Sequence, residues 1–172
     1  PHDKPVNAYR HEQSTPFAGC FSAIRPRKLY TGDETVSVPV VAVIATPGVS
    51  PFHFSVPYMV FGQALPEPDH FCLQICAERP GTVRSEAGLS IATENGLELL
   101  ETASIIIVPF WSHPEENPSH TLLKALQDAW RRGAEVVGLC LGTYVLAYAG
   151  LLDNRRAATH WEYERDFTGR FP

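Results

Sequence analysis

The chain has 172 residues, of which 44% are hydrophobic and 19% are charged, and its formal net charge is -5. This length and composition fit one globular α/β domain with a substantial core. The acidic balance argues against a nucleic-acid-binding surface within these residues, and no run approaches the ~18 consecutive apolar residues of a membrane span. Because no secretion signal opens the chain either, we predict a cytoplasmic protein.

Cysteine usage agrees with that location. Cys20, Cys72, Cys76 and Cys140 are too few and too scattered for a disulfide scaffold, so reduced thiols are expected. Cys72 and Cys76 have no second ligand pair with zinc spacing nearby. We predict no metal and no cofactor.

Residues 1–36 differ from the rest of the chain, because Pro, His, Arg and Ser are scattered through them without periodicity. We interpret them as a flexible leader and place the ordered domain at residues 37–172. Residues 38–45 then form a continuous apolar run, as expected of a parallel strand covered on both faces.

An apolar helix is predicted over residues 51–63, with Ser50 as its N-cap and Pro51 at its first position. Pro57 lies inside this helix and should kink it or break it locally. Alternating and turn-forming residues then predict a strand, a small hairpin and one helical turn, over residues 70–77, 81–93 and 97–101.

The most strongly apolar strand is predicted over residues 103–109, and a polar loop follows over residues 111–117. The next helix should begin at Pro118 with Asn117 as its cap and end at Gly133. Its buried stripe should hold four apolar side chains: Leu122, Leu123, Leu126 and Trp130.

Strands that alternate with helices predict an α/β fold, in which a parallel sheet is flanked by helices on both faces. Functional groups of such sheets gather in the crevice outside the carboxyl ends of the strands. Residues 46–53, 109–113 and 140–143 should therefore meet at one edge of the sheet.

Residues 138–143 read Gly-Leu-Cys-Leu-Gly-Thr and lie between an apolar strand over 134–137 and an apolar helix over 144–149. This pattern predicts a sharp strand–turn–helix elbow that presents Cys140 at a helix N-terminus. Unpaired N–H groups there favour negative charge and should shift the thiol toward the reactive thiolate. The alternative is that Cys140 is only a small core residue.

Three further residues are candidates for the site. His160 follows residues 156–159, which are predicted to form a short edge strand that returns the histidine to the elbow as partner of a thiolate nucleophile. His53 lies one turn into its helix, and Trp111 lies just past the strongest strand, where a ligand pocket would form. The alternatives are a structural or surface role for His160, simple packing for His53, and a contact with the leader for Trp111.

The Cys140 elbow, followed by Ala-Gly-Leu-Leu-Asp-Asn-Arg-Arg-Ala-Ala-Thr-His-Trp over residues 149–161, resembles the class I glutamine amidotransferase-like domain of the PfpI superfamily. The resemblance covers residues 38–172 and is nearest to the version at the N-terminus of AraC/XylS-type transcriptional regulators, the GlxA- and FtrA-like group. It implies a flavodoxin-like fold in a small-molecule-sensing domain that forms a homodimer. It also implies that a last strand and a helix-turn-helix domain follow Pro172, and that DNA is bound through that domain alone.

Two positions depart from the enzymes of the superfamily, such as isonitrile hydratases and glyoxalase-like members. His53 stands where those enzymes place an acidic residue, and Leu141 stands where the hydratases have threonine. Both departures weaken an enzymatic interpretation, so we expect the sensor and dimerisation domain of an AraC-family transcriptional activator. Four residues would surround its unknown small-molecule effector: His53, Trp111, Cys140 and Leu141.

Two alternatives remain open. In the first, the chain is a cysteine-dependent hydrolase or hydratase, with Cys140 as the nucleophile and His53 or His160 as the base. In the second, the domain is a scaffold that only dimerises.

Overall fold

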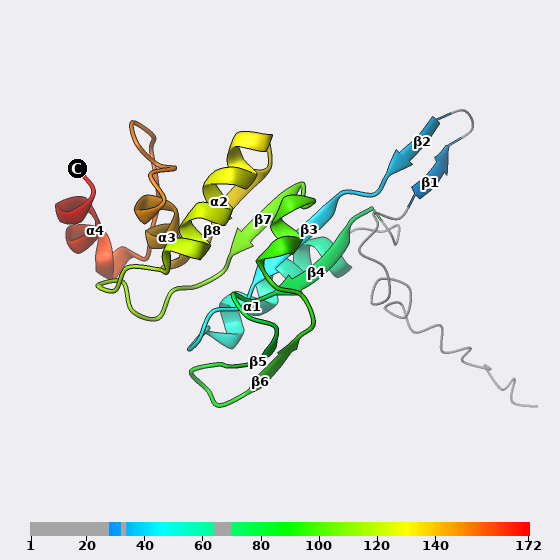
Figure 1. The fold of residues 1–172 in the computed structure, drawn as a ribbon. Helices are drawn as coiled ribbons and strands as arrows, with labels where there is room; N and C mark the ends of the chain where they lie inside the picture. The colour runs from blue at the N-terminus through cyan, green and yellow to red at the C-terminus, as the bar shows by residue number, and fades with distance from the viewer. Residues whose placement is uncertain (1–27, 32–33, 64–69) are drawn as a thin grey trace, which may run out of the picture.

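A four-stranded parallel sheet forms the centre of the domain in the computed structural model, which describes residues 28–31, 34–63 and 70–172 (Figure 1). The strands follow the order β4-β3-β7-β8, and every neighbouring pair is parallel. Their bounds are β3 Val40–Ile44, β4 Cys72–Cys76, β7 Ile105–Val108 and β8 Glu135–Gly138. The predicted parallel sheet is confirmed.

Successive side chains of a strand point to opposite faces of the sheet, and here the two faces are covered differently. One face carries Val40, Ala42 and Ile44 of β3 and lies under three helices in a single buried cluster. These are the 3-10 helix η2 (Leu97–Glu101), α2 (His120–Arg132) and α3 (Gly142–Tyr148). We call this the closed face.

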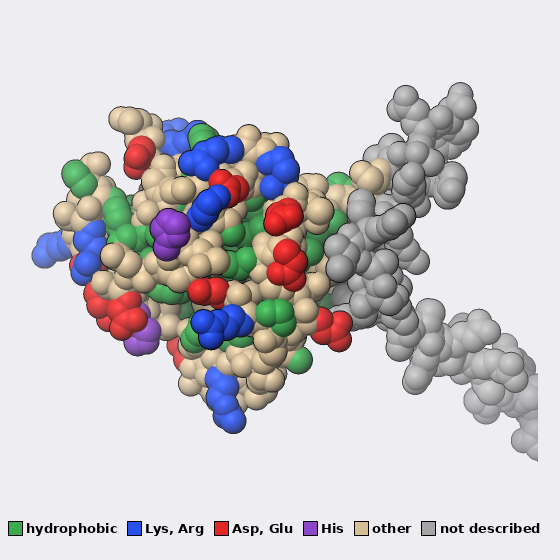
Figure 2. Space-filling view, viewed as in Figure 1, with side chains coloured by type: hydrophobic (Ala, Val, Ile, Leu, Met, Phe, Trp, Pro, Cys, Tyr) green, Lys and Arg blue, Asp and Glu red, His purple; other side chains and the backbone are tan. Residues whose placement is uncertain are grey.

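On the surface of the molecule, side chains of both charge signs are interspersed on the side shown in Figure 2.

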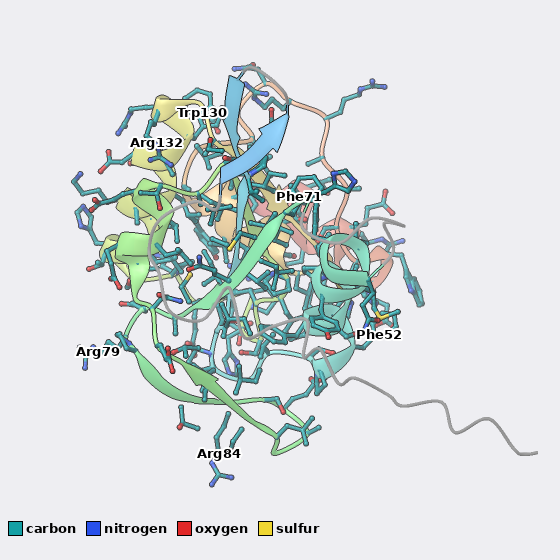
Figure 3. All side chains as sticks on the ribbon, turned by 90° about the vertical axis from the view of Figure 1, so that its right-hand side faces the viewer. Phe52, Phe71, Arg79, Arg84, Trp130 and Arg132 are labelled. Atoms are coloured by element: carbon teal, nitrogen blue, oxygen red, sulfur yellow. The ribbon has the colours of Figure 1, made fainter. Side chains whose placement is uncertain are left out.

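The other face carries Val41 and Val43, and α1 (Pro51–Tyr58) lies on its side. The π-helix η1 (Met59–Gln63) follows α1 directly. We call this the open face. Figure 3 shows Phe52 of α1 and Trp130 of α2 on opposite sides of the sheet. Helices therefore flank both faces, as the sequence predicts.

Most elements before α2 agree with the expectations. The helix begins at Pro51 after Ser50, although the Ser50 side chain makes no capping bond. Pro57 remains inside α1, and the helix changes to π geometry two residues later, because proline has no N–H for the ladder. The hairpin consists of β5 (Gly81–Arg84) and β6 (Ser90–Thr93), which pair antiparallel.

The start of α2 and part of its buried stripe were predicted wrongly. Ser119 is the cap, and its hydroxyl accepts the N–H of Leu122 at 3.1 Å, so the helix begins later than Pro118. Trp130 is 45% exposed rather than buried, and the Arg155 guanidinium lies 5.8 Å from the centre of its ring. An arginine over an aromatic ring gives that ring a favourable partner at the surface.

Two strands lie within the segment interpreted as a leader. β1 (Lys28–Thr31) pairs antiparallel with β2 (Glu34–Ser37), a hairpin that the sequence did not predict. Residues 1–27 and 32–33 lie outside the described residues, so the leader stays a prediction there.

The chain after α3 also differs from the expectation. Residues 156–159 form no strand, and a 3-10 helix η3 (Trp161–Tyr163) and α4 (Glu164–Arg170) follow them. The Phe167 ring of α4 lies edge-on to the Tyr144 ring of α3 with centroids 4.9 Å apart. No helix in the described ranges is long and apolar enough to cross a membrane.

Candidate functional site at the cysteine elbow

The elbow has the sharp backbone turn that its glycines predict. Cys140 has φ of 51°, a left-handed conformation that side chains other than glycine rarely adopt. A Cβ on Gly138 would lie 2.8 Å from the Thr143 backbone, and one on Gly142 would collide with the Val108 carbonyl oxygen. The elbow therefore holds Cys140 between β8 and α3 through close backbone contacts that only glycine permits.

The surroundings of the Cys140 thiol act on its pKa in two opposite ways. Burial raises the pKa of the Cys140 thiol, and the Leu141 N–H beside the sulfur offsets only part of that effect. This direction is opposite to the shift that the sequence predicts, and the reactivity of Cys140 stays a prediction. A charged sulfur loses hydration beside the cluster of Leu141, Tyr144 and Phe167 against which Cys140 packs.

His53 lies on the side of α1 that faces the elbow. Its ring stacks on Phe110 with centroids 5.2 Å apart, and Phe110 follows directly after β7 and Pro109. Nδ1 of His53 is buried without a hydrogen-bond partner among the described residues. Burial lowers the pKa of His53; Glu86 opposes that shift, and the nearby His160 adds to it.

His160 reaches the elbow without the predicted edge strand. The Thr159 hydroxyl donates to the Cys140 carbonyl at 3.2 Å, and the Thr143 hydroxyl donates to the Ala158 carbonyl at 2.9 Å. These two side-chain bonds, rather than a ladder with β8, position the segment. His160 itself accepts the Glu162 N–H through Nδ1 at 3.3 Å.

The positions of the two histidines relative to Cys140 bear on the predicted nucleophile–base pair, which stays a prediction. In the part of the chain that the structure describes, no hydrogen bond joins the Cys140 sulfur to His53 or His160. An activated cysteine needs such a partner within hydrogen-bond reach, although free sites are often looser than loaded ones. Burial thus disfavours the charged forms of both the Cys140 thiol and the His53 imidazole.

Trp111 and Leu141 are held by different contacts, and their predicted roles in ligand binding stay predictions. The Trp111 indole N–H donates to the Glu116 carbonyl at 3.1 Å and so fixes its own loop. Tyr148 strengthens that loop with a bond to the Pro114 carbonyl at 2.8 Å. Leu141 is 5% exposed and packs in the core, so only its backbone N–H faces the sulfur.

Sequence reasoning missed Phe110, Thr159 and Glu86, which contact or polarise the site. Phe110 could have been suspected, because it stands one residue past a strand end at the functional edge. Nothing in the sequence marks Glu86, which reaches His53 from the hairpin between β5 and β6.

Possible metal ligands gather at one place among the described residues. Ligand atoms of His113, Glu115 and Glu116 lie within 4.8 Å of one another, but all three residues are exposed. Exposed acidic side chains are solvated without an ion, so we assign no metal to this loop.

The comparisons with known proteins agree with this geometry. Residues 39–170 match the DJ-1/PfpI family. The chain belongs to the DJ-1/PfpI family. The resemblance seen in the sequence is confirmed, and so is the fold class.

Its curated relatives include helix-turn-helix transcriptional regulators. The chain is similar to CdhR of Pseudomonas aeruginosa, with 34% identity over 92 residues, 54% of this chain and 27% of the relative. It is also similar to GlxA of Rhizobium meliloti, with 35% identity over 96 residues, 54% of this chain and 29% of the relative. The chain thus spans less than a third of either regulator.

A solved structure extends the similarity over more of the domain. The AraC family transcriptional regulator from Pseudomonas putida shares 27% identity, covering 78% of this chain and 73% of that chain with a TM-score of 0.68.

Proposed function

We propose that this chain is the effector-sensing and dimerising domain of an AraC-type transcriptional activator. The effector is a small molecule bound at the elbow site beside His53, Trp111 and Cys140. DNA is contacted through a helix-turn-helix domain outside these residues. The similarity of this family member to transcriptional regulators carries this proposal, and the burial that raises the pKa of the Cys140 thiol supports it.

The surface charge supports the division of labour between two domains. The net charge is -5, and charges of both signs are interspersed on the side shown in Figure 2. A DNA-binding surface gathers Lys and Arg on one face to meet phosphates. Sequencing the natural reading frame past Pro172 tests this part, which fails if no helix-turn-helix follows.

The elbow site supplies the chemistry for a small uncharged or weakly polar effector. Nδ1 of His53 is a buried polar atom without a partner among the described residues, and such an atom gains free energy when a ligand supplies a hydrogen bond. Phe110 presents an aromatic surface next to it. A molecule with one polar group and an apolar body fits both.

Dimerisation has a candidate surface on α1 and η1. Phe52, Met59 and Val60 are 71%, 53% and 46% exposed, and exposed apolar side chains that cluster mark interaction surfaces. Sedimentation equilibrium should give twice the 19.0 kDa mass of one chain. Phe52→Glu should release monomers, whereas Trp130→Glu, on the opposite side of the sheet, should leave the dimer intact.

Alkylation of Cys140 separates the sensor from an enzyme. The rate of reaction with iodoacetamide should be slow at pH 7 and reach half its maximum above the ordinary thiol pKa of about 8.5, because burial raises the pKa of Cys140. Cys140→Ser is the control that subtracts the labelling of the other thiols.

The left-handed backbone of Cys140 favours one second candidate, a cysteine-dependent hydrolase or hydratase. Strained residues cluster at active sites. That candidate requires rapid alkylation well below the ordinary thiol pKa, with a dependence on His53 or His160. Such a result would replace the sensor as the proposed function of the elbow.

A further inference from the structure

A cavity lies on the open face, between the sheet, α1 and the β5–β6 hairpin, which Figure 1 shows beside α1. Its floor is Val43 of β3 with Leu73 and Ile75 of β4. Pro51, Phe54, Ser55 and Tyr58 of α1 line one side. Ser85, Leu89 and Ile91 line the other.

Three residues with hydroxyl groups line this cavity, and each hydroxyl has a hydrogen-bond partner. The Tyr58 hydroxyl accepts the Gln63 side-chain N–H at 3.5 Å. The Ser55 hydroxyl donates to the Phe52 carbonyl at 2.7 Å, and the Ser85 hydroxyl accepts the Leu89 N–H at 3.0 Å. Both serines are therefore engaged with nearby backbone. An occupant must be apolar, because a charged or strongly polar group would lose its hydration without compensation.

The size of the cavity sets the size of its occupant. Its volume is about 280 Å³, whereas an apolar cavity of roughly 150 Å³ accepts benzene. Leu89 is 58% exposed and Tyr58 is 37% exposed, so the rim is open to solvent. The space suits a bicyclic aromatic compound or an alkyl chain of similar bulk that enters from the rim.

α1 connects this cavity to the elbow. Phe54 lines the cavity, while its neighbour His53 stacks on Phe110. The hairpin is bonded to the loop before α1, because the Gly48 N–H donates to the Arg84 carbonyl at 2.8 Å and the Glu86 N–H to the Val49 carbonyl at 3.3 Å. Movement of either wall therefore changes the surroundings of His53.

We propose that the cavity between α1 and the β5–β6 hairpin is a second ligand site, which takes small apolar aromatic molecules and transmits their binding to His53 through α1. The site is separate from the elbow. It does not depend on the reactivity of Cys140.

Titration with 1-methylindole, followed by NMR of the isotope-labelled protein, tests the site. Chemical-shift changes that saturate with ligand concentration are expected at cavity-lining residues and at the His53 ring. Indole-3-acetate should not bind there, because its carboxylate finds no partner. Cys140→Ser should bind 1-methylindole as the wild type does, which keeps the result independent of the proposed function of the elbow.

Two rim variants from different elements, Ser55→Trp and Leu89→Trp, should each weaken 1-methylindole binding at least tenfold by filling the opening. Val137→Trp is the matched control, because Val137 is 38% exposed on β8 at the far edge of the sheet, and this variant should bind 1-methylindole normally.

The proposal is overturned if no chemical shift saturates during the titration, if both rim variants bind normally, or if indole-3-acetate binds equally well. It is also overturned if Leu89→Trp dissociates a dimer and no probe binds the wild type, since a second copy then fills the cavity. If the NMR resonances of the His53 ring do not change when the probe binds, the proposed transmission through α1 is wrong.

Discussion

The two faces of the sheet carry similar apolar residues but are covered to different extents. On the closed face, Ile106 and Val108 of β7 and Leu126 of α2 are each 0% exposed and belong to one continuous cluster. A hollow on that side lies farther out, between η2 and α2, and charged side chains such as Glu101, Lys124 and Asp128 line it. The contribution of the closed face is stability, because each buried aliphatic side chain contributes roughly 1.5–3 kcal/mol.

The open face is less completely covered. Val41 and Val43 are buried, yet Val137 in the same layer is 38% exposed, and the cavity remains between β4 and α1. The residue with an unpartnered buried nitrogen, His53, lies on the helix of this side. The filled closed face contrasts with an open face on which α1 is separated from β4 by a cavity.

The elbow connects β8 to α3, and substitution of its Gly142 should have the largest effect on stability. Gly142→Ala should destabilise the fold by about 3–5 kcal/mol or abolish it, because the new Cβ would collide with the Val108 carbonyl. Urea unfolding measures the loss. Gly169→Ala is the control, since no atom beyond its chain neighbours and its own helix backbone lies within 4 Å of a Cβ there, and the helical site should gain up to about 1 kcal/mol. Equal stability of both variants would mean that the elbow is not closely packed.

Truncating one leucine on each side tests the difference between the faces directly. Leu126→Ala should cost about 2–5 kcal/mol, as a large-to-small change in a filled core does. Leu89→Ala, at the rim of the open cavity with 58% exposure, should cost less than about 1 kcal/mol. The free energy of unfolding in urea, measured for the wild type and both variants, gives the two losses. If the two losses are alike, the open face is as tightly packed as the closed one.

Much of the closed face could be predicted from the sequence, because it depends on local patterns. The isoleucine run of β7 and the glycines around Cys140 specify a buried strand and an elbow with little reference to the rest of the chain. The start of α2 was less predictable, since Asn117 and Ser119 are both good caps and only the bond from Leu122 decides between them.

The site could not be predicted to the same depth, because its properties arise from distant residues. The pKa of Cys140 depends on its burial against a cluster that includes Phe167 of α4, a helix that the sequence did not reveal. The position of His160 depends on two threonine hydroxyls that replace a strand ladder. Stacking of His53 on Phe110 joins segments more than fifty residues apart in the chain.

The smallest expected effect is the pH dependence that His53 gives to the open side. Because burial and the nearby His160 lower the pKa of His53 in the fold while Glu86 only partly opposes them, the unfolded chain binds more protons there in mild acid. The stability is therefore complete above the ordinary histidine pKa of about 6.5 and falls as the pH drops through the lowered value. His53→Asn should remove that part of the pH dependence. Urea unfolding of both proteins at pH 7.5 and at about pH 5, with the His53 ring resonance titrated by NMR, provides the measurement. If the titration midpoint of the wild-type His53 ring lies at or above the ordinary histidine pKa, His53 is solvated as a surface histidine is. The protonation of His53 would then not affect the stability of the open side.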